Sequence, residues 1–158
     1  MRYEVFDESV IKKDPAYRTQ EHMERTYREV TRPSAEERIS LNDSLSPEFL
    51  SCSWADKTLR FKFKNRPWMQ NTGGNIHGGM LASVCDMAMG ILARYMKGSA
   101  DCVTVSLGVD YMRKVPADVD LLVESRVEKA GRNVYFMSAR VYRMSDLKLA
   151  VTANATFM

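Results

Sequence analysis

The sequence has 158 residues, of which 45% are hydrophobic and 27% are charged, a balance typical of one folded domain and not of a disordered chain. The net charge of +3 is unevenly divided, because residues 1–50 contain 8 basic and 11 acidic residues and residues 51–158 contain 15 basic and 9 acidic ones. The mildly basic second part suits a small polyanion, but it lacks the dense basic stripe of a nucleic-acid-binding protein.

No apolar run reaches membrane-spanning length, and the first residues, MRYEVFDESV, lack the basic and then apolar pattern of a secretion signal. The three cysteines, Cys52, Cys85 and Cys102, are far apart and form no CxxC pair. This spacing favours buried free thiols in a reducing compartment. We therefore expect a cytoplasmic protein that is not bound to a membrane.

The first 48 residues are predicted to be helical. Asp14 and Pro15 form a start signal for a helix that would run to Val30 with one modest apolar stripe. The segment carries no evident catalytic chemistry. We treat residues 1–48 as an amphipathic helical extension that packs on the remainder of the chain.

A second, shorter helix is predicted within this extension. Ser34 and Glu37 have the spacing of a capping box, in which each side chain satisfies a free backbone N–H group. The helix would end near Leu41.

Strand and helix patterns alternate from residue 49 onward. The stretch LRFKFK (59–64) alternates apolar and basic side chains, as a strand with one wet face does. Residues 77–97 form a strongly apolar helix that Gly98 would end. Four further strands are expected at 103–111, 119–128, 134–143 and 147–157. The order predicts an α+β domain, residues 49–158, in which a curved antiparallel sheet wraps around one long central helix.

One narrow stripe of this helix differs from its apolar remainder. Its members are small or polar and lie three or four positions apart: Gly79, Ser83, Asp86, Gly90 and Arg94. The stripe is either the solvent edge of the helix or one wall of a pocket. In a pocket, Asp86 is a candidate general base or nucleophile. Packing is the expected role of Ser83, which has no evident base, and of Cys85, which lies on another face.

Glycines form the entrance to the helix. Gly78 and Gly79 fall in the first turn, where backbone N–H groups lack internal partners and the helix dipole adds positive potential. The pair indicates either a tight turn or a binding site for a carbonyl oxygen that gains negative charge. His77, taken alone, favours a structural hydrogen bond.

The spacing along the helix constrains any shared site. Gly78 and Asp86 are eight residues apart, or about 12 Å at 1.5 Å per residue. One acyl carbonyl cannot contact both groups on the same chain. If both act on it, they belong to different subunits, which predicts an active site across a dimer interface.

The polar residues and glycines of this region form a spaced pattern. An asparagine and a glycine precede HGG, and an acid follows nine residues after the histidine: Asn71, Gly74, His77, Gly78, Gly79 and Asp86. Further matching positions follow in the strands and a turn: Thr104, Tyr111, Arg113, Gly131 and Arg132. With this pattern, residues 49–158 resemble the PaaI-like acyl-CoA thioesterases of the hotdog fold, in the 4-hydroxybenzoyl-CoA thioesterase superfamily.

The resemblance implies a homodimer, commonly assembled into a homotetramer, that hydrolyses an acyl-CoA thioester to a carboxylic acid and CoA. The backbone N–H of Gly78 would polarise the thioester carbonyl, and His77 and Asn71 would shape that side of the site. Asp86 of the partner subunit would act as general base or nucleophile, and Thr104 of the partner subunit would help to place water. No cofactor is implied, since CoA is part of the substrate.

Four basic residues are candidates for binding the CoA phosphates: Arg113, Lys114, Lys129 and Arg132. They lie near strand ends and turns, where relatives commonly bind CoA, although ordinary surface charge would look the same. No metal site is expected, because the two histidines lie 55 positions apart with no ligand spacing around them.

Two alternative functions stay open at this stage. A non-catalytic acyl-CoA binding or sensor protein would typically lack the acid or the glycine, and a hydroxyacyl-thioester dehydratase would pair a histidine with an acid in a different arrangement. The pattern does not specify the acyl group, the tetramer arrangement, or the pathway in which the protein acts.

Overall fold

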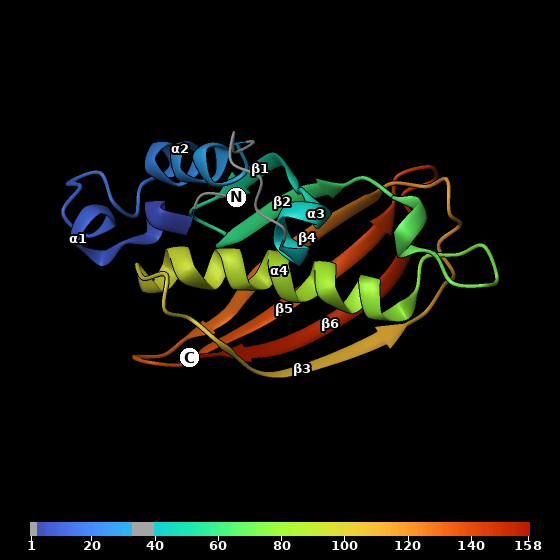
Figure 1. The fold of residues 1–158 in the computed structure, drawn as a ribbon. Helices are drawn as coiled ribbons and strands as arrows, with labels where there is room; N and C mark the ends of the chain where they lie inside the picture. The colour runs from blue at the N-terminus through green and yellow to red at the C-terminus, as the bar shows by residue number, and fades with distance from the viewer. Residues whose placement is uncertain (1–2, 33–39) are drawn as a thin grey trace.

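The computed structural model describes residues 3–32 and 40–158 (Figure 1). The helical elements are η1 (Tyr3–Phe6), α1 (Glu8–Ile11), α2 (Gln20–Val30), α3 (Leu41–Leu45), η2 (Pro67–Met69) and α4 (Gly78–Lys97). The strands are β1 (Glu48–Ser53), β2 (Thr58–Phe63), β3 (Thr104–Tyr111), β4 (Leu121–Ala130), β5 (Tyr135–Arg143) and β6 (Leu149–Phe157).

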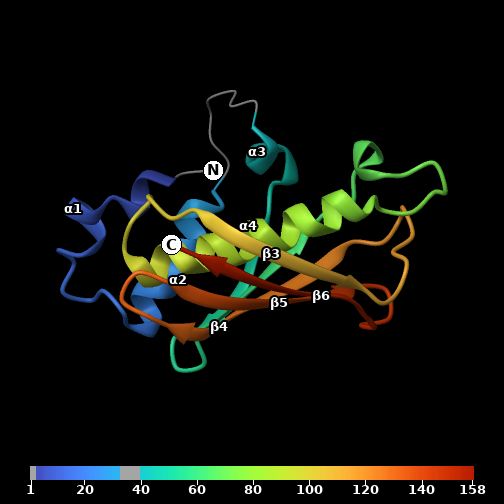
Figure 2. The same cartoon turned by 90° about the horizontal axis from the view of Figure 1, so that it is seen from below.

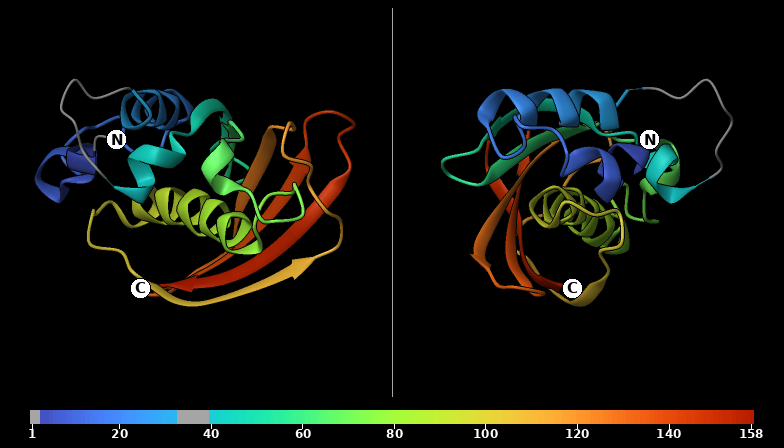
Figure 3. Two further views of the ribbon diagram at one scale, coloured as in Figure 1. Left: turned by 45° about the vertical axis from the view of Figure 1, so that its right-hand side comes forward. Right: turned by 90° about the vertical axis from the view of Figure 1, so that its left-hand side faces the viewer.

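The six strands form one antiparallel sheet in the order β1-β2-β4-β5-β6-β3, so β1 and β3 are its edges (Figure 1). Figure 2 shows the β3 side of this sheet from below. Several strand pairs contain a register shift, and such irregularities bend a sheet and increase its twist. The sheet curves around α4 (Figure 3). The predicted hotdog architecture is therefore confirmed.

Alternating side chains give the sheet one buried face. On β2, Leu59, Phe61 and Phe63 are fully buried, while the intervening basic residues are exposed or half-buried. The same period recurs on β4, where the buried Ser125 hydroxyl donates a hydrogen bond of 3.2 Å to the carbonyl of Ala88 in α4. The core is thus the inner face of the sheet packed on α4.

Both ends of α4 agree with the sequence prediction. His77 is its N-cap, and Gly98 is its C-cap in the left-handed conformation, with φ of 68°. The predicted helix over residues 77–97 is confirmed to within one residue. Among the described residues, no helix is both long enough and apolar enough to cross a membrane.

The predicted start of the first helix is wrong. The helix begins at Gln20, where the Thr19 hydroxyl caps it by accepting a hydrogen bond from a backbone N–H group. The Asp14 carboxylate instead accepts the N–H of Ala16 in a local turn, and Arg18 adopts a positive φ of 70°. A short polar side chain that bonds its own backbone competes with a helix in this way.

The second predicted helix lies mostly outside the described residues, since Ser34 and Glu37 fall between the two described ranges. Its expected end near Leu41 is wrong. Ser40 is extended and caps α3 by accepting the N–H of Asp43, so Leu41 begins a helix. The strand β1 was not predicted either.

The N-terminal extension shares the buried core with the rest of the chain. Its helix α2 lies against β1 (Figure 1), and Tyr27 is fully buried with its ring 5.3 Å from that of Tyr95 in α4. The Tyr17 hydroxyl donates a 2.8 Å hydrogen bond to the Tyr95 carbonyl. These contacts attach the extension to the C-terminal half of α4.

Candidate functional site

The first turn of α4 leaves one backbone N–H group available. The imidazole Nδ1 of His77 accepts the N–H of Gly79 at 3.0 Å, and the carbonyl of His77 accepts those of Met80 and Leu81. Within residues 3–32 and 40–158, no hydrogen bond uses the N–H of Gly78. This group lies at the positive end of a 20-residue helix and is suited to bind an oxygen atom that carries partial negative charge.

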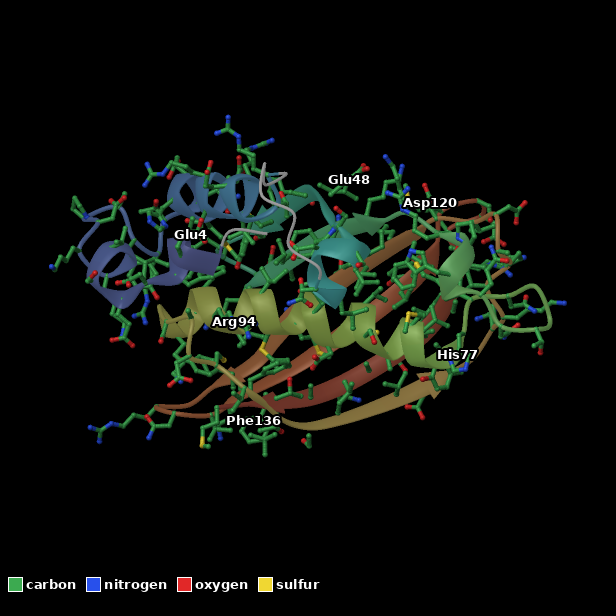
Figure 4. All side chains as sticks on the ribbon, in the orientation of Figure 1. Glu4, Glu48, His77, Arg94, Asp120 and Phe136 are labelled. Carbon is green, nitrogen blue, oxygen red and sulfur yellow. The ribbon has the colours of Figure 1, made fainter. Side chains whose placement is uncertain are left out.

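His77 therefore has a structural task in this chain. Because its Nδ1 accepts a hydrogen bond, the neutral ring carries its hydrogen on Nε2. The side chain lies at the beginning of α4, far along the helix from Arg94 (Figure 4). This contact agrees with the expectation that His77 is a structural hydrogen-bonder, and its part in shaping a catalytic site stays a prediction.

Tyr111, the last residue of β3, contacts the same turn. Its hydroxyl donates a hydrogen bond of 2.9 Å to the carbonyl of Gly78. A Cβ atom added to Gly78 would lie 3.4 Å from the Tyr111 ring, in van der Waals contact. The tyrosine thus packs against the glycine and helps to fix the peptide that carries the open N–H group.

A cavity of about 280 Å³ opens beside this turn. Its lining includes Asn71, Gly78 and Tyr111, together with the basic residues Arg113 and Lys114. The side-chain oxygen of Asn71 accepts two backbone N–H groups of its own loop, at 2.9 and 3.2 Å. Asn71 therefore shapes the loop that forms one wall of the cavity.

Asp86 has a defined partner on its own chain. The Thr104 hydroxyl donates a hydrogen bond of 2.7 Å to the half-buried carboxylate. The two residues come from different elements, since Asp86 lies in the middle of α4 and Thr104 begins β3. The pair was predicted to act together, and the fold brings it together.

A second cavity, of about 200 Å³, lies next to this carboxylate. It is lined by Leu41, Asn42, Ala82, Ser83, Asp86, Met87 and Leu107. Part of the small-residue stripe of α4 therefore forms the wall of a pocket, as one of the two interpretations of the sequence proposed.

The four predicted CoA-binding cations divide between two ends of the sheet. Arg113 and Lys114 follow Tyr111 and line the cavity at Gly78. Lys129 lies at the end of β4, and Arg132 lies in the turn that leads into β5. The first residue of β5, Tyr135, pairs with Phe157 of β6, and Phe157 also pairs with Thr104 of β3. Lys129 and Arg132 are therefore at the same end of the sheet as Thr104. The fold therefore places two cations near Gly78 and two toward the end that holds Thr104.

The other nucleophiles of α4 are poorly suited to catalysis. Burial, and to a smaller extent the neighbouring Asp86 charge, raises the pKa of the Cys85 thiol to about 12, so little thiolate forms at neutral pH. The Ser83 hydroxyl donates to the Gly79 carbonyl within the helix. Both residues fit the packing roles expected from the sequence.

Two features of the site were missed by sequence reasoning. The contact of Tyr111 with Gly78 depends on how β3 is placed against α4, which no local pattern reveals. The approach of Leu41 to Asp86 also depends on tertiary structure, but α3 itself had a signal, because Ser40 and Asp43 have the spacing of a helix cap.

Comparison with known proteins agrees with this geometry. The family model described as "Thioesterase superfamily" matches residues 73–150, the segment that runs from the loop before α4 into β6. The chain belongs to the thioesterase superfamily. The match includes Gly78, Asp86 and Thr104, and so it covers both halves of the candidate site.

Individual relatives extend the comparison. Acyl-coenzyme A thioesterase THEM4 of Xenopus laevis is 29% identical over 104 residues, covering 66% of this chain and 46% of that protein. The chain thus spans about half the length of this curated relative. The crystal structure of zebra fish thioesterase superfamily member 2 has a TM-score of 0.72 and 25% identity, covering 84% of this chain and 94% of the other. The E. coli PaaI protein, at 16% identity and a TM-score of 0.64 over 77% of this chain and 84% of its own, shares the fold.

Proposed function

We propose that the protein is an acyl-CoA thioesterase that hydrolyses a thioester to a carboxylic acid and CoA. The observation that carries the proposal is the presence of two complementary groups on α4: an open N–H at Gly78 and a carboxylate, Asp86, held by Thr104. Thioester hydrolysis needs a donor for the carbonyl oxygen and a base or nucleophile. The name of the Xenopus relative supports acyl-CoA as the substrate class.

The Gly78 end of the helix is suited to polarise the thioester carbonyl. As the bond to the nucleophile forms, the carbonyl oxygen gains negative charge, and an N–H group at a helix N-terminus stabilises that charge. Tyr111 restrains the neighbouring peptide through its bond to the Gly78 carbonyl. The interaction becomes stronger in the transition state, which is what accelerates a reaction.

The carboxylate for the same carbonyl is proposed to come from a second subunit. In a straight helix the eight-residue separation of Gly78 and Asp86 corresponds to about 12 Å. Asp86 of the partner subunit would then activate water or attack the carbonyl carbon, with Thr104 of the partner subunit orienting the carboxylate. If Asp86 activates water, the water oxygen bonds to the carbonyl carbon as the C–S bond breaks, and the CoA thiolate receives the proton taken from water. If Asp86 attacks, the C–S bond breaks to give an anhydride with Asp86, which water then hydrolyses. In both routes the products are the free acid and the CoA thiol.

The edge strand β3 is suited to form this dimer. Two apolar side chains of β3, Val105 and Tyr111, are more than half exposed in the single chain, and so is Val103 just before the strand. An edge strand with exposed apolar residues is a template for pairing with another chain. A two-fold axis perpendicular to the strands would make two paired copies of β3 antiparallel, so the Thr104 end of one strand would lie at the Tyr111 end of the other. That pairing carries each Asp86 toward the Gly78 of the other chain.

The divided cations fit the same arrangement. Arg113 and Lys114 lie at the Gly78 end, and Lys129 and Arg132 lie at the Thr104 end. In a dimer of this kind, the Thr104 end of one subunit would lie near the Gly78 end of the other. We propose that these residues bind the CoA phosphates and that no further cofactor is needed. Homotetramer assembly and a cytoplasmic location also stay predictions.

The test is CoA release from a panel of aryl- and fatty-acyl-CoA substrates. Asp86→Asn and Gly78→Pro should each lower kcat by about 10²- to 10³-fold. Proline is favoured at the first helical position, and the extended φ and ψ of His77 suit a residue before proline. Gly78→Pro therefore removes the N–H group and places ring carbons there and against Tyr111, while the start of the helix is kept. Asp56→Asn, in the exposed β1–β2 turn, is the matched control.

Unchanged turnover in Asp86→Asn would reject this mechanism. Tight acyl-CoA binding without hydrolysis across the whole panel would instead indicate a binding or sensor protein. Formation of an enoyl product from a 3-hydroxyacyl-CoA would indicate a dehydratase.

A further inference from the structure

The N-terminal extension contributes a wall to the cavity beside Asp86. Helix α3 lies near the middle of α4 in two views (Figures 1 and 3), and its residues Leu41 and Asn42 line the 200 Å³ cavity together with the acid. The shared cavity places part of the extension at the region where the chemistry is proposed. It is independent of the contacts that attach α2 to the C-terminal half of α4.

Short as it is, α3 is fixed at both ends. The Ser40 hydroxyl accepts the Asp43 N–H at 3.1 Å at its start, and Leu45 at its end is buried, with 2% of its surface exposed. Ser46 then turns the chain through a left-handed conformation with φ of 44°. Leu41 is therefore held over the cavity although 47% of its surface is exposed.

The cavity has the chemistry of a site for an apolar group next to a carboxylate. The polar residues of its wall are Asn42, Ser83 and Asp86. Four apolar side chains form the remainder of the lining: Leu41, Ala82, Met87 and Leu107. An acyl tail bound here would remove both its own surface and that of Leu41 from water. An engineered protein cavity of about 150 Å³ accommodates benzene, so a cavity of about 200 Å³ suits a ring or a short chain.

We infer that Leu41 sets the size of the acyl group that the enzyme accepts, by closing the end of the pocket beside Asp86. The inference rests on the proposed thioesterase function and names its substrate class: small aryl or short aliphatic acyl groups. Leu41 is a specificity-determining residue in this account and takes no part in the reaction itself. Removing its side chain lengthens the pocket, and enlarging it shortens the pocket.

The test compares Leu41→Ala and Leu41→Trp with the wild type in kcat/KM for a series of acyl-CoAs from four to sixteen carbons, and for benzoyl-CoA. Alanine is a good helix former, so α3 is retained. Leu41→Ala should raise the ratio of long-chain to short-chain kcat/KM at least about 10-fold, since one or two methylenes in an apolar pocket change specificity by this order. Leu41→Trp should lower the ratio. Leu50→Ala, an exposed leucine on β1, is the control and should leave it unchanged.

The outcome separates this inference from the proposed function. Wild-type turnover on any member of the series supports the thioesterase proposal, whatever Leu41 does. A chain-length profile that is identical in both Leu41 variants and the wild type overturns the inference alone. If no substrate is hydrolysed, affinities for a matched series of acyl-CoA thioethers decide it, because a size limit set by Leu41 must appear in binding as well.

Discussion

The Thr104 hydroxyl is important for its direction as well as for its distance. It donates to one oxygen of the Asp86 carboxylate at 2.7 Å, which leaves the second oxygen for a water molecule or a carbonyl carbon. A hydrogen bond to a charged group contributes more than one between neutral groups. At the residue scale, Thr104 is therefore expected to position the acid.

Replacing this hydroxyl should reduce turnover without unfolding the protein. Thr104→Val keeps the shape and the strand preference but removes the donor, so kcat should fall by roughly 10- to 100-fold, the effect of about 1.5–3 kcal/mol. Thr104→Ser keeps the donor and should retain most of the activity. Steady-state kinetics with one acyl-CoA substrate measures both. A wild-type kcat in Thr104→Val would show that the hydroxyl is not needed.

At the scale of single elements, the end of α4 depends on a glycine for two separate reasons. Gly98 has φ of 68°, a conformation that side chains rarely adopt, and a Cβ atom there would lie 2.6 Å from the Tyr17 hydroxyl. That hydroxyl is bonded to the Tyr95 carbonyl and joins the extension to α4. Gly74 has the same φ but no atom within 4 Å of a Cβ position.

Alanine substitutions at these two glycines separate the cost of backbone strain from the cost of steric crowding, because only Gly98 has close neighbours. Gly74→Ala should cost only the conformational term, about 1 kcal/mol of unfolding free energy. Gly98→Ala should cost more, about 2–3 kcal/mol, because the Tyr17 hydroxyl must also move. Urea unfolding monitored by circular dichroism measures both. Equal losses would show that the Tyr17 contact adjusts freely.

The contact between α2 and α4 should also make stability depend on pH. His22 is 4% exposed, with Nδ1 3.0 Å from the Tyr95 hydroxyl and Nε2 3.6 Å from the Asp14 carboxylate. Burial lowers the pKa of His22 below its usual 6.5, an effect that Asp14 opposes and Arg25 reinforces. The unfolded chain then binds a proton that the folded chain excludes, so stability falls as pH decreases below about 6.5.

Replacing His22 should remove that decrease. His22→Asn keeps a group able to bond Tyr95 but does not titrate, so its urea midpoint should change less between pH 7.5 and pH 5.5 than that of the wild type. The other histidine provides the control, since His77→Asn retains His22 and should retain the decrease. A wild-type midpoint that is constant over this range would contradict the assignment of a neutral, buried His22.

Periodicity predicted the elements that lie over the core better than those of the extension. The helix α4 and strands β2 to β6 have long regular patterns, and burial confirms those of α4, β2, β4, β5 and β6. The residues of β3 are all exposed or half-buried in the single chain. The extension has short elements whose ends depend on single capping residues. Asp14 and Thr19 both resemble helix N-caps, and the sequence prediction chose Asp14 although the helix begins after Thr19. The sequence could place Gly78 and Asp86 on one helix, but only the sheet register brings Tyr111 and Thr104 to them.

At the scale of the whole molecule, the proposed mechanism gives one chain two half-sites, each completed by a second subunit. The Gly78 group and the Asp86 group lie about 12 Å apart on one rigid helix, and the exposed residues of β3 provide a surface through which a second copy can complete both sites. A symmetric dimer contains two equivalent sites, each with one group from either chain. In such a dimer, two chains with different inactivating substitutions can together form one intact site, which a site within a single chain does not allow.

Two inactive variants should restore activity when mixed. A dimer of one Gly78→Pro chain and one Asp86→Asn chain has one site with both wild-type groups and one site with neither. Random exchange of subunits makes about half of the dimers mixed, so activity should rise from near zero to about a quarter of the wild-type value. The measurement is CoA release after the variants are mixed at equal concentration under mild denaturation and then refolded together. Each variant treated alone is the control, and a mixture no more active than its components would show that both groups act within one chain.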